Sequence, residues 1–158
     1  MSTVMPGGQL VTSINQRLPE TALMADAEAV WVRPDAIREV CALLKETQGL
    51  EFNLLSSVTA VDYVEHFDVV YRLTSIPRNA TAVVKARVFG RERPTLPSVS
   101  VLWKGAELQE REAYDLLGVV FSGHPNLKRI LTWEGFKGHP LRRDYLEPPL
   151  PYSWPHGG

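Results

Sequence analysis

Hydrophobic residues recur at helical spacing in two stretches before residue 50. The first stretch precedes Pro19, which cannot continue a helix, and its apolar positions are Val11, Ile14 and Leu18. The second begins at Pro34, because proline suits a first helical turn, and its apolar positions are Ile37, Val40, Cys41 and Leu44. We therefore expect two amphipathic helices, with Cys41 buried as a small hydrophobe and Gly49 left-handed after the second helix.

Strand-like hydrophobic runs occupy residues 29–32, 52–61, 67–73 and 82–89. The last two runs alternate apolar and polar residues, and the short link over residues 77–80 predicts that they pair as an antiparallel hairpin. Two prolines predict a loop over 91–97, whereas 99–103 fits either a further strand or an extended approach to the next helix.

A third helix is predicted over residues 106–117, with Gly118 as its left-handed end. After Phe121 proline and glycine are frequent, so little regular structure is expected, and residues 146–155 should be extended and polyproline-like. This order of elements predicts an α+β fold, with a two-layer sheet, helices mainly on one face and an extended proline-rich C-terminal arm. The expected divisions are an N-terminal helical segment (1–20), an α+β domain (21–120) and a docking arm (121–158).

Composition narrows the possible functions. The 158 residues contain 44% hydrophobic residues, which is typical of a globular domain, and one cysteine, which excludes an internal disulfide and a multi-cysteine zinc site. No stretch is both long and apolar enough to cross a membrane, and no signal peptide is expected, so we expect a reducing cytosolic compartment. Residues 1–62 carry a net charge of −4 and residues 63–158 of +3. That excess is weak for nucleic-acid binding and suits contact with an acidic protein surface.

Glu110 lies in the middle of the apolar stripe of the third helix. A buried carboxylate needs a partner, so we hypothesise an ion pair with an arginine of 128–129 or 142–143 that fixes the arm to the helix. On the opposite side of the helix lie Arg111, Glu112 and Asp115, and Arg111 and Asp115 are spaced to pair with each other. A general acid or base role for Glu110 is the alternative, although the sequence shows no nucleophile or second carboxylate at fixed spacing.

A Gly-His-Pro repeat marks the arm, in residues 121–125 and again in residues 136–140. Glycine and proline favour a turn, so we expect His124 and His139 to bond backbone carbonyls. Metal binding by the two histidines and phosphate binding by the basic residues of 128–143 are the alternatives. The chain lacks a dinucleotide-binding glycine motif, a P-loop and a Gly-x-Ser-x-Gly elbow, so spacing alone predicts no self-contained active site.

From residue 103 onward the sequence resembles the 30-kDa-type peripheral-arm subunit of proton-pumping NADH–quinone oxidoreductase (respiratory complex I). The residues that carry the resemblance are 103–106, 110–118, 121–131 and 138–145. The departures are Leu108, where the family often has tryptophan, and Arg143, where it usually has lysine.

The resemblance implies a structural and assembly role in the peripheral arm of that complex, which couples electron transfer from NADH to quinone with proton translocation. It implies no cofactor on this chain, with FMN and iron–sulfur clusters held by partner subunits. The implied partners are the quinone-pocket large subunit, the subunit with the terminal iron–sulfur cluster and other peripheral-arm subunits, without nucleic acid or a membrane span of its own. The implied place is the cytoplasmic side of the cell or inner membrane.

Within this resemblance, Glu110 is expected to anchor the arm internally, and the basic residues and histidines to hold it against neighbouring subunits. The residues assigned to the interface or to anchoring are Glu110, Arg111, Glu112, Asp115, His124, Pro125, Arg129, His139, Pro140, Arg142, Arg143 and Asp144. The alternatives are the equivalent subunit of a ferredoxin-dependent photosynthetic complex, a deazaflavin-dependent dehydrogenase or a membrane-bound hydrogenase, and a stand-alone α+β binding module.

Overall fold

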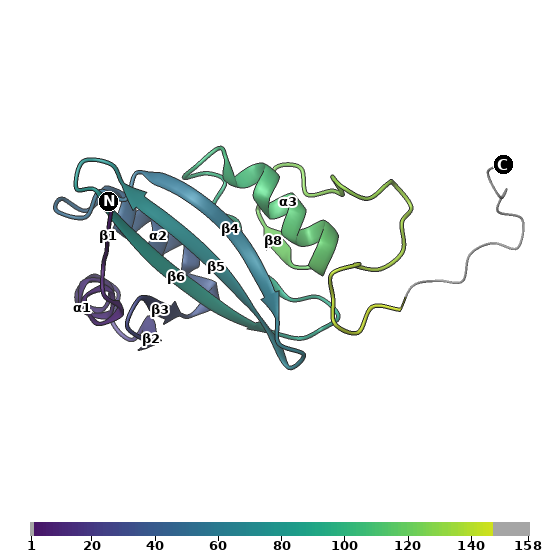
Figure 1. Cartoon of the computed structure of the whole chain (residues 1–158), viewed down its shortest axis with the longest axis horizontal. Helices are drawn as coiled ribbons and strands as arrows, with labels where there is room; N and C mark the ends of the chain where they lie inside the picture. The colour runs from purple at the N-terminus through teal and green to yellow at the C-terminus, as the bar shows by residue number, and fades with distance from the viewer. Residues whose placement is uncertain (1, 147–158) are drawn as a thin grey trace, which may run out of the picture.

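The computed structural model describes residues 2–146 and is built around a mixed β-sheet (Figure 1). Its elements, in chain order, are β1 (Thr3–Val4), α1 (Gly7–Arg17), β2 (Ala22–Ala25), β3 (Ala29–Val32), the 3-10 helix η1 (Pro34–Ala36), α2 (Ile37–Glu46), β4 (Leu54–Asp62), β5 (His66–Ser75), β6 (Ala80–Phe89), β7 (Thr95–Pro97), α3 (Ala106–Leu117) and β8 (Val120–Ser122). The strand order in the main sheet is β2-β3-β6-β5-β4, and β1 pairs with β6.

The centre of the sheet is the predicted hairpin of β5 and β6. These strands pair antiparallel from His66 opposite Phe89 to Ser75 opposite Ala80, which confirms the prediction. Their inward residues are fully or almost fully buried, namely Phe67, Val69, Tyr71, Leu73, Ala82, Val84, Ala86 and Val88. Strand β3 joins β6 in parallel, and β4 joins β5 antiparallel, so the sheet is mixed.

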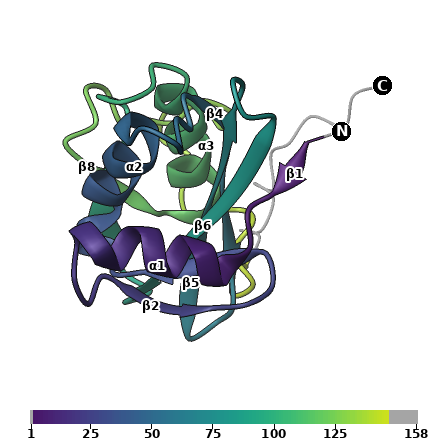
Figure 2. The same ribbon diagram turned by 90° about the vertical axis from the view of Figure 1, so that its left-hand side faces the viewer.

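The helices cover one face of the sheet, and Figure 2 shows α2 and α3 on the same side of it. Leu10 and Ile14 of α1 pack into the same core as the α2 stripe and as Ala106, Ala113 and Leu117 of α3. This arrangement confirms the predicted two-layer α+β fold. Cys41 is fully buried, as expected, and burial raises the pKa of its thiol.

Three predictions of local structure need correction. Residues 22–25 form the unpredicted strand β2, because their extension comes from pairing with β3 rather than from an alternating pattern of their own. Residues 95–97 form strand β7 inside the predicted loop, paired in parallel with β8, and Pro97 is tolerated because β7 is an edge strand of a two-stranded sheet. Residues 99–103 form a turn, in which the Trp103 N–H bonds the Val99 carbonyl at 3.2 Å.

The arm of residues 123–146 consists of turns, bends and irregular backbone that returns along α3. Most of the segment predicted to be polyproline-like lies outside the described residues. Within residues 2–146 no helix is long and apolar enough to cross a membrane.

Candidate functional site

The arm caps the C-terminal end of α3. The last carbonyls of a helix have no partner within it, so they need donors from elsewhere. Three of the last four carbonyls of α3 accept hydrogen bonds from the arm. The Asp115 carbonyl accepts from His139 Nδ1 at 2.9 Å, and the Leu116 carbonyl accepts from the Leu141 N–H at 2.9 Å. The Leu117 carbonyl accepts from Arg142 Nε at 2.6 Å. The fourth, that of Tyr114, accepts the Gly118 N–H at 2.8 Å.

The Asp115 carboxylate, on the same end of α3, organises the start of the arm. One oxygen accepts the backbone N–H groups of Ile130, Leu131 and Thr132, at 3.1, 2.7 and 2.8 Å. The other accepts Arg129 Nη1 at 2.9 Å and the Thr132 hydroxyl. Burial alone would raise the pKa of Asp115, but the bonds from Thr132, Arg129 and Leu131 outweigh it and hold the pKa well below its usual range.

Arg129 ties two parts of the arm together. Besides Asp115, its guanidinium donates to the Gly138 carbonyl at 2.9 Å and lies over the ring of Phe136, 5.5 Å from the centroid. A cation at this position also interacts favourably with the negative end of the α3 dipole. The arm is therefore held through charge and backbone bonds rather than through regular secondary structure.

Both histidines of the Gly-His-Pro repeat bond helix carbonyls, which confirms that prediction. Nε2 of His124 lies 2.9 Å from the Glu107 carbonyl, and its Nδ1 accepts the Asn126 N–H, so Nε2 carries the proton. His139 donates from Nδ1 to Asp115, and burial lowers its pKa. The preceding glycines, Gly123 and Gly138, both have φ above +80°, a conformation that glycine adopts without strain.

Glu110 is fully buried, as predicted, but its expected pairing with an arginine is wrong. Its carboxylate accepts the Ser98 hydroxyl at 2.6 Å and the Val99 N–H at 2.8 Å, while His124 Nε2 lies 3.9 Å away. Glu110 bonds the turn after β7. Arg129 of the arm instead pairs with Asp115, which lies about one turn further along α3. Burial raises the pKa of Glu110, and the bond from Ser98 only partly opposes this effect.

The expected pair of Arg111 and Asp115 is also wrong. Arg111 instead donates to the backbone carbonyls of Lys128 and Arg129, at 3.0 and 2.9 Å. Asp115 is buried, so it bonds the arm that covers it rather than the more exposed Arg111. Glu112 is exposed and lines a shallow hollow between α3 and β4.

A second fastening, which the sequence analysis missed, joins the arm to the end of β4. Arg91 donates two bonds of 2.8 Å to Asp62 and also binds Asp144 at 3.0 Å. The backbone N–H of Arg143 donates to Asp62 at 2.9 Å. The Arg91 bonds hold the pKa of Asp62 well below its usual range. These groups are 29 or more positions away from Asp62 in the sequence, so no local spacing could have revealed them.

The remaining predicted residues lie along the same arm. Arg142 lies over the Phe67 ring, 5.2 Å from the centroid, and its Nη2 is buried without a hydrogen-bond partner among the described residues. The Arg143 side chain and Pro125 are exposed, and Pro140 is half-buried. The structure thus brings Asp115, Arg129, His139 and Arg142 together around the end of α3 and leaves Glu110 and Glu112 apart from them.

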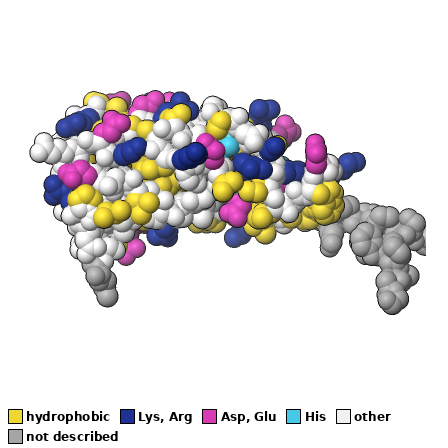
Figure 3. All heavy atoms as spheres, turned by 90° about the horizontal axis from the view of Figure 1, so that it is seen from above, with side chains coloured by type: hydrophobic (Ala, Val, Ile, Leu, Met, Phe, Trp, Pro, Cys, Tyr) yellow, Lys and Arg dark blue, Asp and Glu magenta, His cyan; other side chains and the backbone are white. Residues whose placement is uncertain are grey.

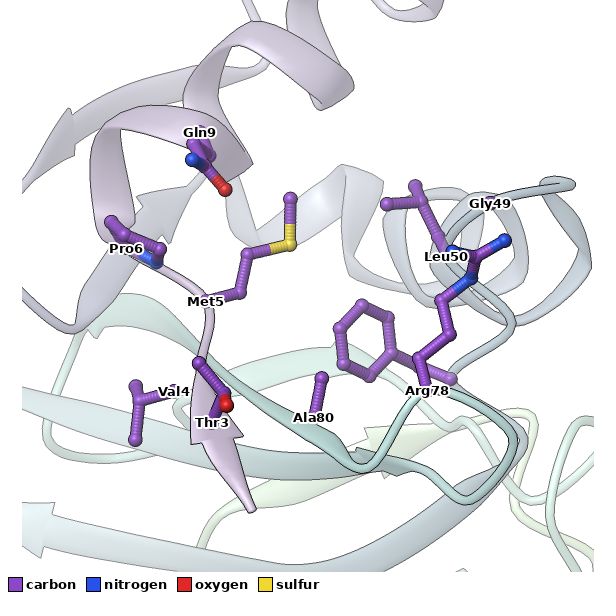
Figure 4. Close-up of a pocket in the computed structure, with 10 residues that line it drawn as sticks. Thr3, Val4, Met5, Pro6, Gln9, Gly49, Leu50, Arg78 and Ala80 are labelled. Carbon is purple, nitrogen blue, oxygen red and sulfur yellow. The ribbon is translucent and has the colours of Figure 1, made fainter.

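At the opposite end of the molecule, a mainly apolar hollow of about 430 Å³ opens between β1, α1 and the turn after α2 (Figure 4). Met5, Leu50 and Phe52 line it, and Arg78 at its rim pairs with Glu51 at 3.4 Å. Its lining contains no carboxylate, histidine or cysteine, so it offers no group for acid–base or nucleophilic chemistry. Within residues 2–146 no three histidine, cysteine or acidic side chains gather as a metal site.

The sequence and the fold are both similar to those of known respiratory-chain proteins. Residues 30–149 match the family model described as "Respiratory-chain NADH dehydrogenase, 30 Kd subunit". An NADH-quinone oxidoreductase subunit of Moorella thermoacetica is 47% identical over 122 residues, which cover 76% of this chain and 80% of that protein. The mitochondrial "NADH dehydrogenase [ubiquinone] iron-sulfur protein 3" of Candida albicans is 38% identical over 142 residues, or 88% of this chain and 50% of that protein.

The chain thus spans about half the length of the fungal mitochondrial relatives that it matches. Among solved structures, a chain of the membrane-bound sulfane sulfur reductase, an archaeal respiratory membrane complex, aligns with a TM-score of 0.72 and 26% identity. That alignment covers 88% of this chain and 85% of the other. The family model covers most of the sheet, helix α3 and the arm that bonds to it. The chain therefore belongs to the 30-kDa subunit family of respiratory-chain NADH dehydrogenases.

Proposed function

We propose that this chain is a non-catalytic structural subunit in the peripheral arm of an NADH–quinone oxidoreductase. It docks through its C-terminal arm against the quinone-pocket large subunit and the subunit that holds the terminal iron–sulfur cluster. The assembled enzyme passes electrons from NADH to quinone and couples this transfer to proton translocation. FMN and the iron–sulfur clusters belong to partner subunits, and the complex presents this chain on the cytoplasmic side of the membrane.

The observation that carries this proposal is the use of the titratable residues on α3 and the arm. Asp115, Arg129 and His139 bond one another or the backbone of their own chain. Glu110 likewise bonds Ser98 and Val99. A catalytic acid or base needs access to a substrate proton, whereas these groups are engaged in holding the arm and a neighbouring turn. This pattern supports a scaffold that fixes the shape of the arm.

Affinity purification from native membranes tests the proposal. The tagged chain is expressed in its own organism, membranes are solubilised in mild detergent, and captured proteins are identified by mass spectrometry. We expect recovery of the flavin, cluster and quinone-pocket subunits, together with NADH–quinone oxidoreductase activity. Recovery of the tagged chain alone, under conditions in which an unrelated respiratory complex survives, would contradict the proposal and favour a stand-alone binding module.

A second candidate is the equivalent subunit of a related membrane-bound respiratory complex. The structural likeness to a chain of the archaeal sulfane sulfur reductase complex favours this alternative. The same purification separates the two candidates, because the electron-input subunit differs. An NADH-oxidising flavin subunit in the captured set supports the first candidate, and a different electron-input subunit supports the second.

A further inference from the structure

The arm exposes large apolar side chains from a backbone that is firmly held. Leu131 is 61% exposed and Trp133 is 71% exposed. Yet the backbone N–H groups of Leu131 and Thr132 bond the buried Asp115 carboxylate at 2.7 and 2.8 Å. A buried charged group therefore fixes the segment whose apolar side chains face solvent. Exposed apolar side chains that gather in one place mark interaction sites on soluble proteins.

Aromatic contacts restrict Trp133 further. Its ring packs edge-on against Phe136, with centroids 4.8 Å apart, and Phe136 stacks on Tyr145 at 6.3 Å. Arg129 also lies over the Phe136 ring and connects this cluster to Asp115. An aromatic side chain that is already ordered loses little conformational entropy on binding, which makes it an effective anchor.

The charges around this cluster are mostly positive. Two of the nearby acidic residues are engaged, because Asp115 pairs with Arg129 and Asp144 with Arg91. The exposed basic residues that flank the cluster are Lys128, Lys137 and Arg143. None of these three makes an ion pair with a carboxylate of residues 2–146, and Glu134 is the exposed acid beside them. The excess of positive charge fits an acidic partner surface.

A hollow of about 470 Å³ adjoins the cluster, lined by Tyr114, Leu127, Lys128, Arg129, Glu134 and Gly135. Figure 3 shows hydrophobic side chains gathered at this end of the molecule, with both basic and acidic side chains beside them. The face therefore combines a projecting apolar anchor with a polar recess whose charged lining residues are Lys128, Arg129 and Glu134. A recess beside a projection suits a shaped protein surface better than a flat lipid surface.

We infer that Leu131 and Trp133 form the anchor by which the arm inserts into an apolar pocket, rimmed by carboxylates, on a neighbouring protein subunit. This inference rests on the proposed docking function of the arm and names the surface that performs it. Arg129, His139 and Arg142, which the sequence analysis placed against neighbouring subunits, act here as internal supports. The partner-facing cations are Lys128, Lys137 and Arg143.

The test uses the full-length tagged chain, expressed in cells that lack the endogenous copy. The double variant Leu131→Ala/Trp133→Ala is compared with Leu23→Ala/Ile76→Ala, which removes apolar side chains of similar exposure (61% and 65%) away from the arm. We expect the arm variant to recover about tenfold less of the partner subunits and the control pair to match wild type. Trp133→Phe should restore most of the recovery when Leu131 is kept. Thermal unfolding of each purified variant checks that folding is unchanged.

A charge variant, Lys128→Glu/Lys137→Glu, tests the acidic rim. We expect it to reduce recovery of the partner subunits, and we expect wild-type recovery to fall as salt rises. Equal recovery by wild type and by the folded arm variant would overturn the anchor, while leaving the proposed function intact. Failure of the wild-type chain itself to recover any subunit would instead count against the proposed function.

A membrane surface is the competing occupant, since tryptophan and lysine also favour anionic lipid. The purified wild-type chain is therefore mixed with vesicles of equal parts phosphatidylglycerol and phosphatidylcholine and sedimented. We expect no binding that depends on Trp133. Binding that the Leu131→Ala/Trp133→Ala variant loses would overturn the protein-docking inference in favour of a lipid contact.

Discussion

Two carboxylates are fully buried on α3, in opposite electrostatic settings. Asp115 receives three backbone N–H groups, a hydroxyl and an arginine, so its charged form is strongly favoured. Glu110 receives one hydroxyl and one backbone N–H, and burial dominates, so its pKa rises. The pKa values of two carboxylates five positions apart on one helix are thus shifted in opposite directions.

Asp115→Asn should destabilise the protein by about 3 kcal/mol at neutral pH. Arg129 loses the negative charge that it pairs with, and the amide NH₂ of asparagine cannot accept the hydrogen bonds that the carboxylate oxygen accepts. Urea unfolding of the full chain measures the change. The control is Asp35→Asn, whose side chain is 73% exposed and 3.9 Å from Arg33, and which should change the free energy of unfolding by less than about 0.5 kcal/mol. Equal effects of the two substitutions would show that the Asp115 contacts contribute little.

The Asp115 contribution should also depend on pH. The folded state holds the pKa of Asp115 below its unfolded value of about 4, so its contribution is present above that pH. It is lost as pH falls through the lower pKa of the folded state. The difference in unfolding free energy between wild type and Asp115→Asn should therefore shrink on acidification below about pH 4.

Glu110→Gln should remove a pH dependence of the opposite sign. Because the pKa of Glu110 is raised in the folded state, its favourable contribution is complete below the unfolded pKa of about 4 and is lost as pH rises through the folded pKa. Unfolding measured from about pH 4 to about pH 8 should show wild type losing stability with rising pH relative to Glu110→Gln. A constant difference across this range would mean that Glu110 titrates in the folded protein as it does in the unfolded chain.

At the scale of elements, the end of α3 is completed by the arm. Gly118 has φ +79° and follows the last helical residue. A Cβ at this position would overlap Arg142 and would lie 2.7 Å from His139 Cδ2. Glycine is needed here both for the left-handed turn and for the close approach of the two side chains that cap the helix.

Gly118→Ala should therefore cost at least about 1–2 kcal/mol, through backbone strain and displacement of the capping side chains. The matched control is Gly105→Ala at the other end of α3, where φ is −62° and the added Cβ points into open space. That control should stay within about 0.5 kcal/mol of wild type. Hydrogen exchange at Leu131 and Thr132 should speed up in Gly118→Ala alone, and unchanged exchange would show that the cap is not coupled to the arm.

At the scale of the whole molecule, α1 and the arm lie at opposite ends of the sheet (Figure 1), and α1 contributes to the core. Leu10 and Ile14 of α1 are fully buried, and Gly7 starts the helix against the backbone of Asp26, in the turn after β2, and of Ala29 in β3. A Cβ on Gly7 would overlap the Asp26 carbonyl and lie 2.5 Å from the Ala29 carbonyl. Backbone atoms cannot move aside as cheaply as the end of a flexible side chain can.

Gly7→Ala should accordingly destabilise the whole domain by about 2–3 kcal/mol. Gly8→Ala, one position along, has open space around the added Cβ and should be neutral or stabilise the protein by up to about 1 kcal/mol. Thermal unfolding of both variants makes the comparison. A similar loss in both would indicate that helix propensity, rather than the close approach of Gly7, controls this position.

Local pattern was sufficient for the elements whose hydrophobic period is their own. The helix over residues 106–117 and the hairpin of β5 and β6 were predicted correctly because their side chains repeat at about 3.6 or 2 residues. The Gly-His-Pro turns were also predicted correctly, since glycine and proline restrict the backbone locally. Strands β2 and β7 were missed because each is short and is extended only through pairing with another strand.

In the candidate site too, local features were predictable from the sequence and long-range contacts were not. Sequence alone determined that Glu110 is buried, that the histidines mark turns and which family the chain resembles, because helical period, backbone restriction and a long spaced motif are properties of neighbouring residues. Only the tertiary structure decided that Arg129 pairs with Asp115, and that Arg91 forms ion pairs with both Asp62 and Asp144. The physical reason is that ion pairs depend on distance and burial in space, and several arginines in one segment offer equivalent charge until packing selects one of them.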